Sequence, residues 1–331
     1  MTITKTLMGA AATVALATGM AAAEPGLIID LGGKFDKSFN ESAYNGAQRW
    51  VEETGGSYAE TELANEAQRE QTMRRMAERG ADPIVVLGFA NASTLDVVAP
   101  DYPETRFVII DEVVDQPNVK SITFAEPEGS YLVGVMAAMA SETGTVSFIG
   151  GMDVPLISKF ACGYAQGVKA TNPDAEVIVN MTGTTPTAWN DPVKGAELTR
   201  SQIGQGSDVV FAAAGGTGIG VLQAAADADI LAIGVDSNQN GLHPGKVLTS
   251  MVKRVDNAVF DVFTAAENGT LETGHEVLGL DNEGVAVAMD ENNAELVSPE
   301  MKAAVEEAQA KIASGEIEVH DYLTDNSCPA Y

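Results

Sequence analysis

The sequence predicts an α/β protein of two lobes, each built on a doubly wound parallel sheet. Short apolar runs alternate with segments of helical periodicity along the chain, and runs that are apolar throughout are typical of strands covered on both faces. This alternation occurs twice, in two stretches of similar length. A chain of 331 residues is also long enough for two domains of ordinary size.

The first stretch opens with the apolar run GLIID, which predicts a strand at 26–30. Helical periodicity predicts helices at 40–53, 66–79 and 92–98. Further apolar runs predict strands at 83–87, 106–110 and 119–124. The order of these elements is that of a parallel sheet with helices on both faces.

The second stretch repeats the pattern. Strands are expected at 145–149, 176–180, 208–213, 230–235 and 247–251, and helices at 129–141, 159–170, 192–205, 218–227, 255–268 and 299–314. The chain is expected to cross between the lobes near residues 125, 252 and 285. The N-terminal lobe is then 24–125 plus about 253–285, and the C-terminal lobe is 126–252 plus about 286–331, joined by short hinge strands.

Residues 1–23 have the features of a secretory signal peptide. Lys5 supplies the positive charge, a small and apolar run follows, and three alanines end at Ala23, a suitable cleavage site. No Cys follows this site, so we expect export to the periplasm without a lipid anchor. No later run reaches the ~18 apolar residues of a membrane span.

The formal net charge of −28 argues against two classes of partner. The chain has 47 Asp and Glu against 19 Lys and Arg, so its surface repels phosphate backbones and anionic lipids. We therefore expect no nucleic acid partner and no membrane insertion. The H-E-x-x-H and G-x-S-x-G motifs of hydrolases are missing as well. These observations favour a binding protein without a cofactor over an enzyme.

The two cysteines, Cys162 and Cys328, form an even pair. In an oxidising compartment such a pair predicts a disulfide, the alternative being two free thiols. Cys328 lies in the polar C-terminal segment TDNSCPAY, which needs a tether. A zinc site is not expected, because the histidines, His243, His275 and His320, lack ligand spacing.

Candidate binding residues follow the predicted strands, because open α/β sheets bind ligands at the carboxyl ends of their strands. In the first stretch, an aromatic face is expected from Phe35 or Phe39, and polar groups from Asp36 and Asn40, with helix capping as the alternative role of the polar groups. Two further candidates follow later strands: Phe89 after a glycine, and Asp111, for which a solvated turn is the alternative.

The candidates of the second stretch are Phe160, Trp189, Gly215, Asp236 and Lys253. Trp189 lies in a polar turn and predicts a lid over a ligand, or otherwise a hydrophobic plug. Gly215 belongs to a glycine-rich loop that lacks the third glycine of a dinucleotide-binding motif, because Val221 occupies that position. Asp236 and Lys253 are expected to pair across the cleft and hold vicinal hydroxyls, the alternative being a structural ion pair.

Eight sequence blocks, in order, carry a family resemblance. They are FDKSFNESAYNG (35–46), VLGFA (86–90), FVIIDE (107–112), FAEPEGSYLVG (124–134), FIGGMDVPLISKFACGYAQGVKATNP (148–173), AAAGGTGIGVLQAA (212–225), IGVDSNQ (233–239) and VLTSMVKRVDNAV (247–259). Together they resemble the BMP family, the basic membrane protein family of ABC-transporter solute-binding lipoproteins. The resemblance implies a periplasmic-binding-protein type I fold with three crossovers and, for many members, a purine nucleoside ligand.

The resemblance also implies roles for individual residues. A base would lie between an aromatic ring of each lobe and beside polar groups of the first block, and a ribose would meet two carboxylates and an amine. The two rings are Phe35 or Phe39 and Trp189, and the polar groups beside the base are Asp36 and Asn40. The carboxylates that meet the ribose are Asp111 and Asp236, and the amine is Lys253. The expected partners are a purine nucleoside and an ABC transporter permease.

Three alternatives remain open at this point. In the first, the protein has the same role but its ligand is riboflavin or a free purine base. In the second, the protein is a periplasmic receptor that presents its ligand to a sensor. The third is an enzyme such as a nucleoside hydrolase, which the lack of hydrolase motifs disfavours.

Overall fold

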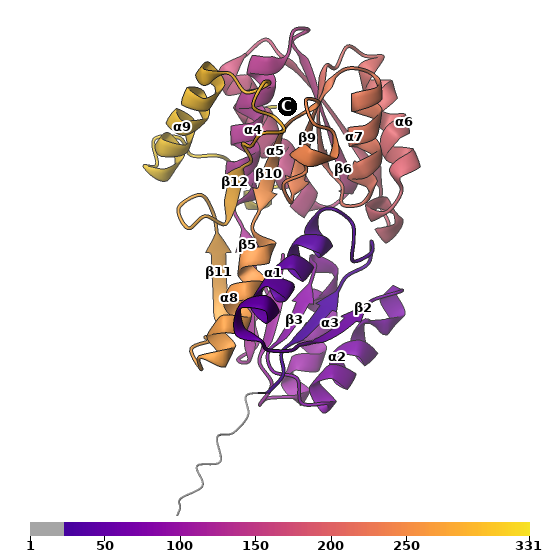
Figure 1. Cartoon of the computed structure of the whole chain (residues 1–331), viewed down its shortest axis with the longest axis vertical. Coiled ribbons are helices and arrows are strands. Elements are labelled where there is room, and N and C mark those ends of the chain that lie inside the picture. Colours follow the sequence, from indigo (N-terminus) through magenta and orange to yellow (C-terminus); the bar gives the residue numbers. More distant parts are fainter. Residues whose placement is uncertain (1–22) are drawn as a thin grey trace, which may run out of the picture.

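The computed structural model of the chain describes residues 23–331, which form two lobes stacked along the long axis (Figure 1). The predicted signal peptide lies outside the described residues except for Ala23. Each lobe contains one sheet, as the sequence predicts, and each sheet has six strands. Within residues 23–331, no helix has the length and apolar character needed to cross a membrane.

The sheet of the N-terminal lobe has the strand order β11-β5-β4-β3-β1-β2, and every pair is parallel. Its strands are β1 (Gly26–Ile29), β2 (Ala59–Glu62), β3 (Ile84–Leu87), β4 (Phe107–Ile110), β5 (Val119–Phe124) and β11 (Gly274–Leu278). Its helices are α1 (Phe39–Thr54), α2 (Arg69–Glu78), α3 (Ala92–Val98) and α8 (Val255–Glu267). Strands β1, β3 and β4 are buried along their whole length, which explains their uniformly apolar sequences.

The sheet of the C-terminal lobe has the order β12-β10-β9-β8-β6-β7, and only its β10–β12 pair is antiparallel. Its strands are β6 (Thr145–Met152), β7 (Glu176–Gly183), β8 (Val209–Ala213), β9 (Leu231–Asp236), β10 (Val247–Lys253) and β12 (Val285–Val287). Its helices are α4 (Glu126–Ala140), α5 (Pro155–Thr171), α6 (Pro192–Ile203), α7 (Thr217–Asp227) and α9 (Pro299–Ala313). Helices α4 and α5 pack together, as do α6 and α7.

The chain passes between the two sheets at three places, which we call the hinge. Strand β5 leads through Ala125 into α4, β10 leads through Arg254 into α8, and β11 leads through 279–284 into β12. Backbone hydrogen bonds join these connections, because the Ala125 N–H donates to the Leu278 carbonyl at 2.9 Å and the Arg254 N–H donates to the Gly284 carbonyl at 2.8 Å. The three connections therefore lie side by side between the lobes (Figure 1).

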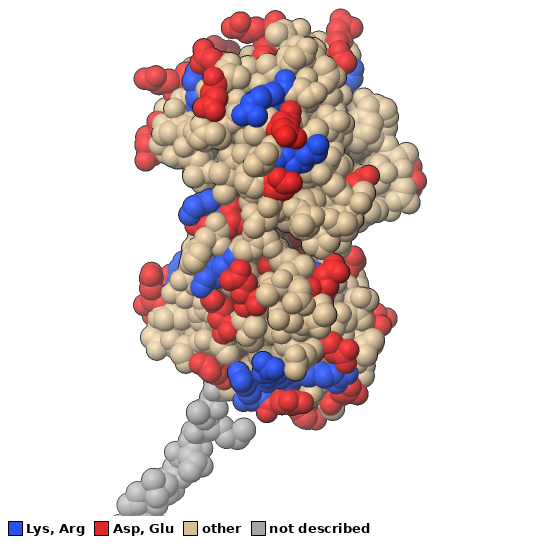
Figure 2. Space-filling view, turned by 90° about the vertical axis from the view of Figure 1, so that its right-hand side faces the viewer, with Lys and Arg blue, Asp and Glu red and all other residues tan. Residues whose placement is uncertain are grey.

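Acidic side chains are spread over both lobes on the face seen in Figure 2. Basic side chains gather mainly at the far end of the N-terminal lobe in this view. The predominance of acidic side chains on this face agrees with the net charge of −28.

Three edge strands are not predicted by the sequence: β2, β11 and β12. Strand β2 has the polar sequence AETE, and β11 is exposed over most of its length, so neither carries an apolar run. Helices α4 and α5 also begin earlier than the predicted residues 129 and 159, since each has a proline in its first turn, where the missing N–H is not needed.

Glycines allow α4 and α5 to approach closely. A Cβ atom on Gly134 would lie 2.2 Å from the carbonyl oxygen of Tyr164, and one on Gly167 would lie 2.0 Å from that of Tyr131. Any larger residue at these positions would therefore force the helices apart. This contact fixes α5, whose first turns line the cavity described below.

We predict that Gly167→Ala destabilises the fold, because the added methyl group overlaps the Tyr131 carbonyl. The expected loss is about 1–3 kcal/mol in the free energy of unfolding, measured by denaturant titration. Gly218→Ala in α7 is the matched control, since its Cβ would lie in ordinary contact with the Ala212 side chain, at 3.7 Å. Equal stability of the two variants would contradict this account of the helix contact.

Candidate ligand-binding site

A cavity of about 630 Å³, partly open to solvent, lies between the lobes at the carboxyl ends of the central strands. Ten of the eleven candidates named from the sequence line it: Asp36, Phe39, Asn40, Phe89, Asp111, Phe160, Trp189, Gly215, Asp236 and Lys253. The cavity therefore joins strand ends from both halves of the chain.

Phe35 is the exception, and its expected role needs correction. Its side chain is 62% exposed and packs edge-on against Tyr44, with ring centroids 5.6 Å apart. Phe39 lies in the first turn of α1 and faces the cavity, whereas residue 35 belongs to the preceding loop. Of the two phenylalanines considered, only Phe39 offers its ring to the cavity.

Aromatic side chains line the cavity from both lobes. Phe39 and Phe89 belong to the N-terminal lobe, and Phe160 and Trp189 belong to the C-terminal lobe. Trp189 ends the short 3₁₀ helix Pro186–Trp189, and its indole packs on Gly151, where a Cβ would come within 2.2 Å of the ring. The glycine thus provides the space that keeps the indole at the cavity wall.

Asp36 and Asn40 are organised by the start of α1. The Asp36 carboxylate accepts hydrogen bonds from three backbone N–H groups, those of Ser38, Asn40 and Glu41, at 2.8, 3.0 and 3.1 Å. Helix capping, the alternative left open by the sequence, is therefore part of its role. The Asn40 amide donates to two loop carbonyls at 3.2 Å, and its oxygen is buried without a hydrogen-bond partner among the described residues. That oxygen is available to a donor on a ligand.

Lys253 forms a buried ion-pair network at the back of the cavity. Its ammonium lies 2.6 Å from Asp111 Oδ1 and 3.0 Å from Glu126 Oε1, and all three side chains are at most 8% exposed. The expected direct pair with Asp236 is wrong, because Asp236 accepts a hydrogen bond from the Ser38 hydroxyl and makes no ion pair within residues 23–331. Lys253 nevertheless stands close enough to Asp236 to influence its pKa.

Glu126 is the site residue that the sequence reasoning missed. It is fully buried at the first position of α4, directly after the first hinge connection. The available signal was a carboxylate at the start of a helix that follows a strand and is apolar from Leu132 onward. Such a charge needs a buried partner, which Lys253 supplies.

Asp111 and Asp236 occupy corresponding places in the two lobes. Asp111 directly follows β4 and Asp236 ends β9, and both have left-handed backbone conformations, with φ of 79° and 62°. Aspartate tolerates this region better than most residues, but the conformation is still uncommon and concentrates at functional sites. Each lobe thus places a carboxylate in this uncommon conformation at the cavity.

Burial dominates the electrostatics of these acids. It raises the pKa of Asp36, Asp111 and Asp236 to about 6 each, although Lys253 opposes the increase at the last two. Burial also disfavours the charge of Lys253, but the surrounding carboxylates outweigh it and hold the pKa of Lys253 above its usual range. The site therefore contains desolvated carboxylates that gain from hydrogen-bond donors.

The lobes touch each other across the cleft. The Ser38 hydroxyl of the N-terminal lobe donates to Asp236, the Ser237 hydroxyl donates to the Ser38 carbonyl at 3.0 Å, and the Gln239 amide donates to the Lys37 carbonyl at 2.8 Å. These contacts hold the loop before α1 against the loop after β9. The structure is therefore a closed arrangement of the two lobes.

Comparison with known proteins identifies the family. Residues 26–322 match the Bmp family, described as ABC transporter substrate-binding protein PnrA-like. The chain belongs to this family. The ABC transporter nucleoside-binding protein BmpA of Lactococcus lactis is 34% identical over 319 residues, which cover 88% of each chain. The Bmp match confirms the resemblance stated from the sequence blocks.

Solved structures with the same fold agree with this assignment. An ABC transporter solute-binding protein from Aeropyrum pernix superposes with a TM-score of 0.82 at 28% identity, covering 90% of this chain and 93% of that chain. The lac repressor, at 13% identity and a TM-score of 0.59 over 83% of each chain, shares the fold alone. The protein thus has the predicted periplasmic-binding-protein type I fold, and it is an extracytoplasmic solute-binding protein of an ABC transporter rather than an enzyme.

We predict that Asp236→Asn stabilises the ligand-free protein at neutral pH and that this gain vanishes in acid. The folded pKa of about 6 lies above the ordinary 3.8, so the buried carboxylate lowers stability above pH 6 and stops doing so as the pH falls toward 4. The gain at pH 7.5 should be about 1–3 kcal/mol.

Denaturant unfolding of wild type and variant at pH 7.5 and pH 4.5 measures this difference. The exposed Asp174→Asn is the control and should change stability little at either pH. A difference between Asp236→Asn and wild type that is the same at both pH values would contradict the assigned cost of burial.

Proposed function

We propose that this protein captures a purine nucleoside in the periplasm and delivers it to an ABC importer. The observation that carries the proposal is the pairing of aromatic walls with buried carboxylates in one interlobe cavity. A flat, apolar ring suits the walls, and a group rich in hydroxyl donors suits the carboxylates. A nucleoside combines both in one neutral molecule.

In the proposed complex, the purine lies between Phe39 of the N-terminal lobe and Trp189 of the C-terminal lobe. The free oxygen of Asn40 accepts a hydrogen bond from the base edge, and Asp36 keeps the start of α1 in place. Stacking of a base on an aromatic side chain contributes about 1–3 kcal/mol. Phe89 and Phe160 complete the apolar surroundings of the ring.

The ribose hydroxyls are proposed to donate to Asp111 and Asp236. These carboxylates come from opposite lobes, so one sugar that contacts both favours closure. Lys253 pairs with Asp111 and opposes the rise in the pKa of Asp236, so it favours the negative charge of both carboxylates. A phosphate placed here would meet several desolvated acids, so nucleotides are expected to be excluded.

The relationship to the nucleoside-binding protein BmpA of Lactococcus lactis supports the same ligand class. We further propose that the lobes move about the hinge as two units, 24–125 with about 253–285 and 126–252 with about 286–331. Cleavage after Ala23 would release the protein into the periplasm, and a lipid anchor is not expected, since both cysteines lie far from this site and form a disulfide.

We predict that adenosine, guanosine or inosine binds, whereas the corresponding nucleoside monophosphate and the 2′,3′-dideoxynucleoside bind at least about 100-fold more weakly, because the acids are then left unpaired or repelled. Isothermal titration calorimetry measures these affinities, and mass spectrometry of the molecule released from denatured, freshly purified protein identifies the natural ligand. Tight binding of riboflavin or a free purine base, with no nucleoside binding, would replace the proposed ligand.

Asp236→Asn provides a second reading of the sugar contact. It is expected to reduce the difference in affinity between the ribonucleoside and the dideoxynucleoside, because the hydrogen bond requires both the Asp236 carboxylate and a ribose hydroxyl. Release of free base on incubation with the wild-type protein would favour the enzyme alternative instead.

We predict that Phe39→Ala and Trp189→Ala each weaken nucleoside binding by about 5- to 150-fold, which corresponds to the loss of one stacking contact. Phe35→Ala is the matched control, because this ring lies in the same loop region but outside the cavity, and its affinity should stay within twofold of wild type. Unchanged affinity in both Phe39→Ala and Trp189→Ala would remove the stacking role.

A further inference from the structure

A chain of buried ion pairs extends from the cavity toward the C-terminal tail. The Lys253 ammonium contacts Glu126 Oε1 at 3.0 Å, and the Lys159 ammonium contacts Glu126 Oε2 at 2.7 Å. The side chains of these residues are at most 6% exposed. Each oxygen of the Glu126 carboxylate is thus paired with a different ammonium, one of which lines the cavity and one of which does not.

The far end of this chain meets the tail that follows α9. The Lys159 ammonium also donates to the Phe124 carbonyl at 3.0 Å and lies 3.6 Å from Asp321 Oδ2. Asp321 is 40% exposed and stands at the start of the short 3₁₀ helix Tyr322–Thr324. The tail therefore supplies the outermost carboxylate of the network.

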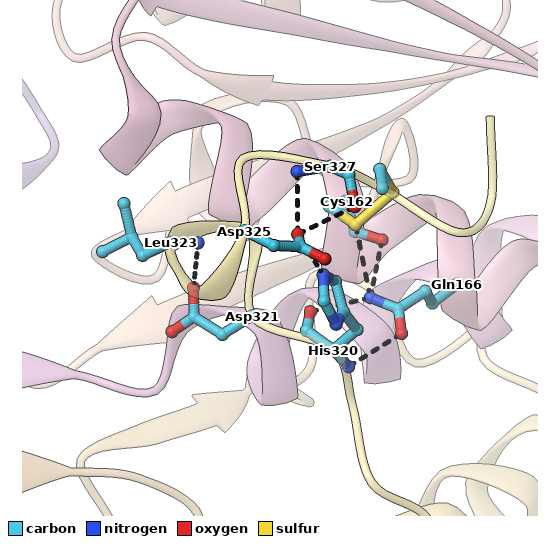
Figure 3. The surroundings of a disulfide bond; sticks show 8 residues. Cys162, Gln166, His320, Asp321, Leu323, Asp325 and Ser327 are labelled. Atoms are coloured by element: carbon cyan, nitrogen blue, oxygen red, sulfur yellow. Dashed lines mark hydrogen bonds and ion pairs between the residues drawn. A yellow bond between two sulfur atoms is a disulfide. The ribbon is translucent and has the colours of Figure 1, made fainter.

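The tail itself is fastened to α5. Cys162 and Cys328 form a disulfide, and Gln166 forms two backbone hydrogen bonds with His320, one donated by its amide at 3.0 Å and one accepted by its oxygen at 2.9 Å (Figure 3). Cys162 and Gln166 lie one turn apart on the helix that also carries Lys159. Asp321 is thus held beside Lys159 by the hydrogen bonds of His320 on one side and the disulfide of Cys328 on the other.

Charge balance explains why this matters at the cavity. A buried carboxylate that loses one of two cationic partners draws the remaining partner more strongly, because the low-dielectric surroundings leave no other compensation. Without Lys159, the Glu126 carboxylate would compete with Asp111 for the Lys253 ammonium alone. The ammonium would then move away from Asp111 and from the ligand.

We propose that Glu126 and Lys159 are positioning residues for Lys253, and that the disulfide-fastened tail keeps Lys159 in place through Asp321, so that the tail contributes to ligand affinity from outside the cavity. This inference rests on the proposed function of the cavity. It assigns a ligand-binding role to a disulfide that the site does not touch, since neither cysteine lines the cavity.

The test compares two aspartates of the tail. Asp321 and Asp325 each accept a hydrogen bond from the backbone N–H two residues ahead, at 2.8 and 2.9 Å (Figure 3). Of the two, Asp321 is the one that lies beside Lys159. Nucleoside affinity is measured by calorimetry for Asp321→Asn, Asp325→Asn, Asp321→Glu, Lys159→Met and Cys328→Ser, at a temperature well below every unfolding midpoint. The midpoints are measured alongside.

Asp321→Asn and Cys328→Ser are expected to weaken binding about two- to fivefold, the range of a partly exposed charge contact, and Lys159→Met about tenfold or more. Asp325→Asn should match wild type, and Asp321→Glu should restore the affinity that Asp321→Asn loses. If Lys159→Met does not fold, the pair of aspartates decides the question. A lower unfolding midpoint with unchanged affinity in Asp321→Asn would make the tail merely structural and overturn the proposal.

The result separates the two proposals. A wild-type protein that binds no nucleoside overturns the proposed function and this inference with it. A wild type that binds, together with an Asp321→Asn variant indistinguishable from Asp325→Asn, overturns this inference alone.

Discussion

The rest of the site depends on the buried ion pairs that the Lys253 ammonium forms with Asp111 and Glu126. Lys253 ends β10 beside one hinge connection, Glu126 begins α4 beside another, and Asp111 comes from the opposite lobe. Burying any one of these charges alone would cost several kcal/mol, so the three must come together for the chain to fold around them. The same ion pairs therefore fix the hinge strands and shape the inner end of the cavity.

This arrangement leaves the cavity with more acid than base. Lys253 is the cation that lines it, whereas Asp36, Asp111 and Asp236 all have raised pKa values because they are buried. A site of this kind is poorly solvated when empty and gains when a ligand supplies hydroxyl donors. The buried carboxylates thereby lower the free energy of unfolding of the ligand-free protein while favouring ligand binding. The left-handed backbone conformations of Asp111 and Asp236 also cost stability at this site.

Small residues set the distances that the charged groups require. Glycines bring α4 against α5, which places Glu126 at the start of one helix within reach of Lys159 on the other. Gly151 makes room for the indole of Trp189 at the opposite wall. The close approach of the helices therefore determines the ion pair of Glu126 with Lys159, and the space at Gly151 determines the position of the aromatic wall. The disulfide-fastened tail contacts the ion-pair network at Lys159, the end farthest from the cavity.

The sequence by itself determined the fold class and the places where a site can form. Uniformly apolar runs identify buried parallel strands, and residues at the ends of such strands meet at one edge of the sheet, which is why Asp111 and Asp236 could be predicted. Trp189 was predicted from its place in a polar turn. Only the tertiary structure decided which of Phe35 and Phe39 turns inward, and that Lys253 pairs with Asp111 and Glu126 instead of Asp236. Edge strands β2 and β11 also needed it, since they lack an apolar run, and so did β12, which is only three residues long. The physical reason is that ion pairing and ring orientation depend on distances between segments far apart in the chain, which local patterns do not encode.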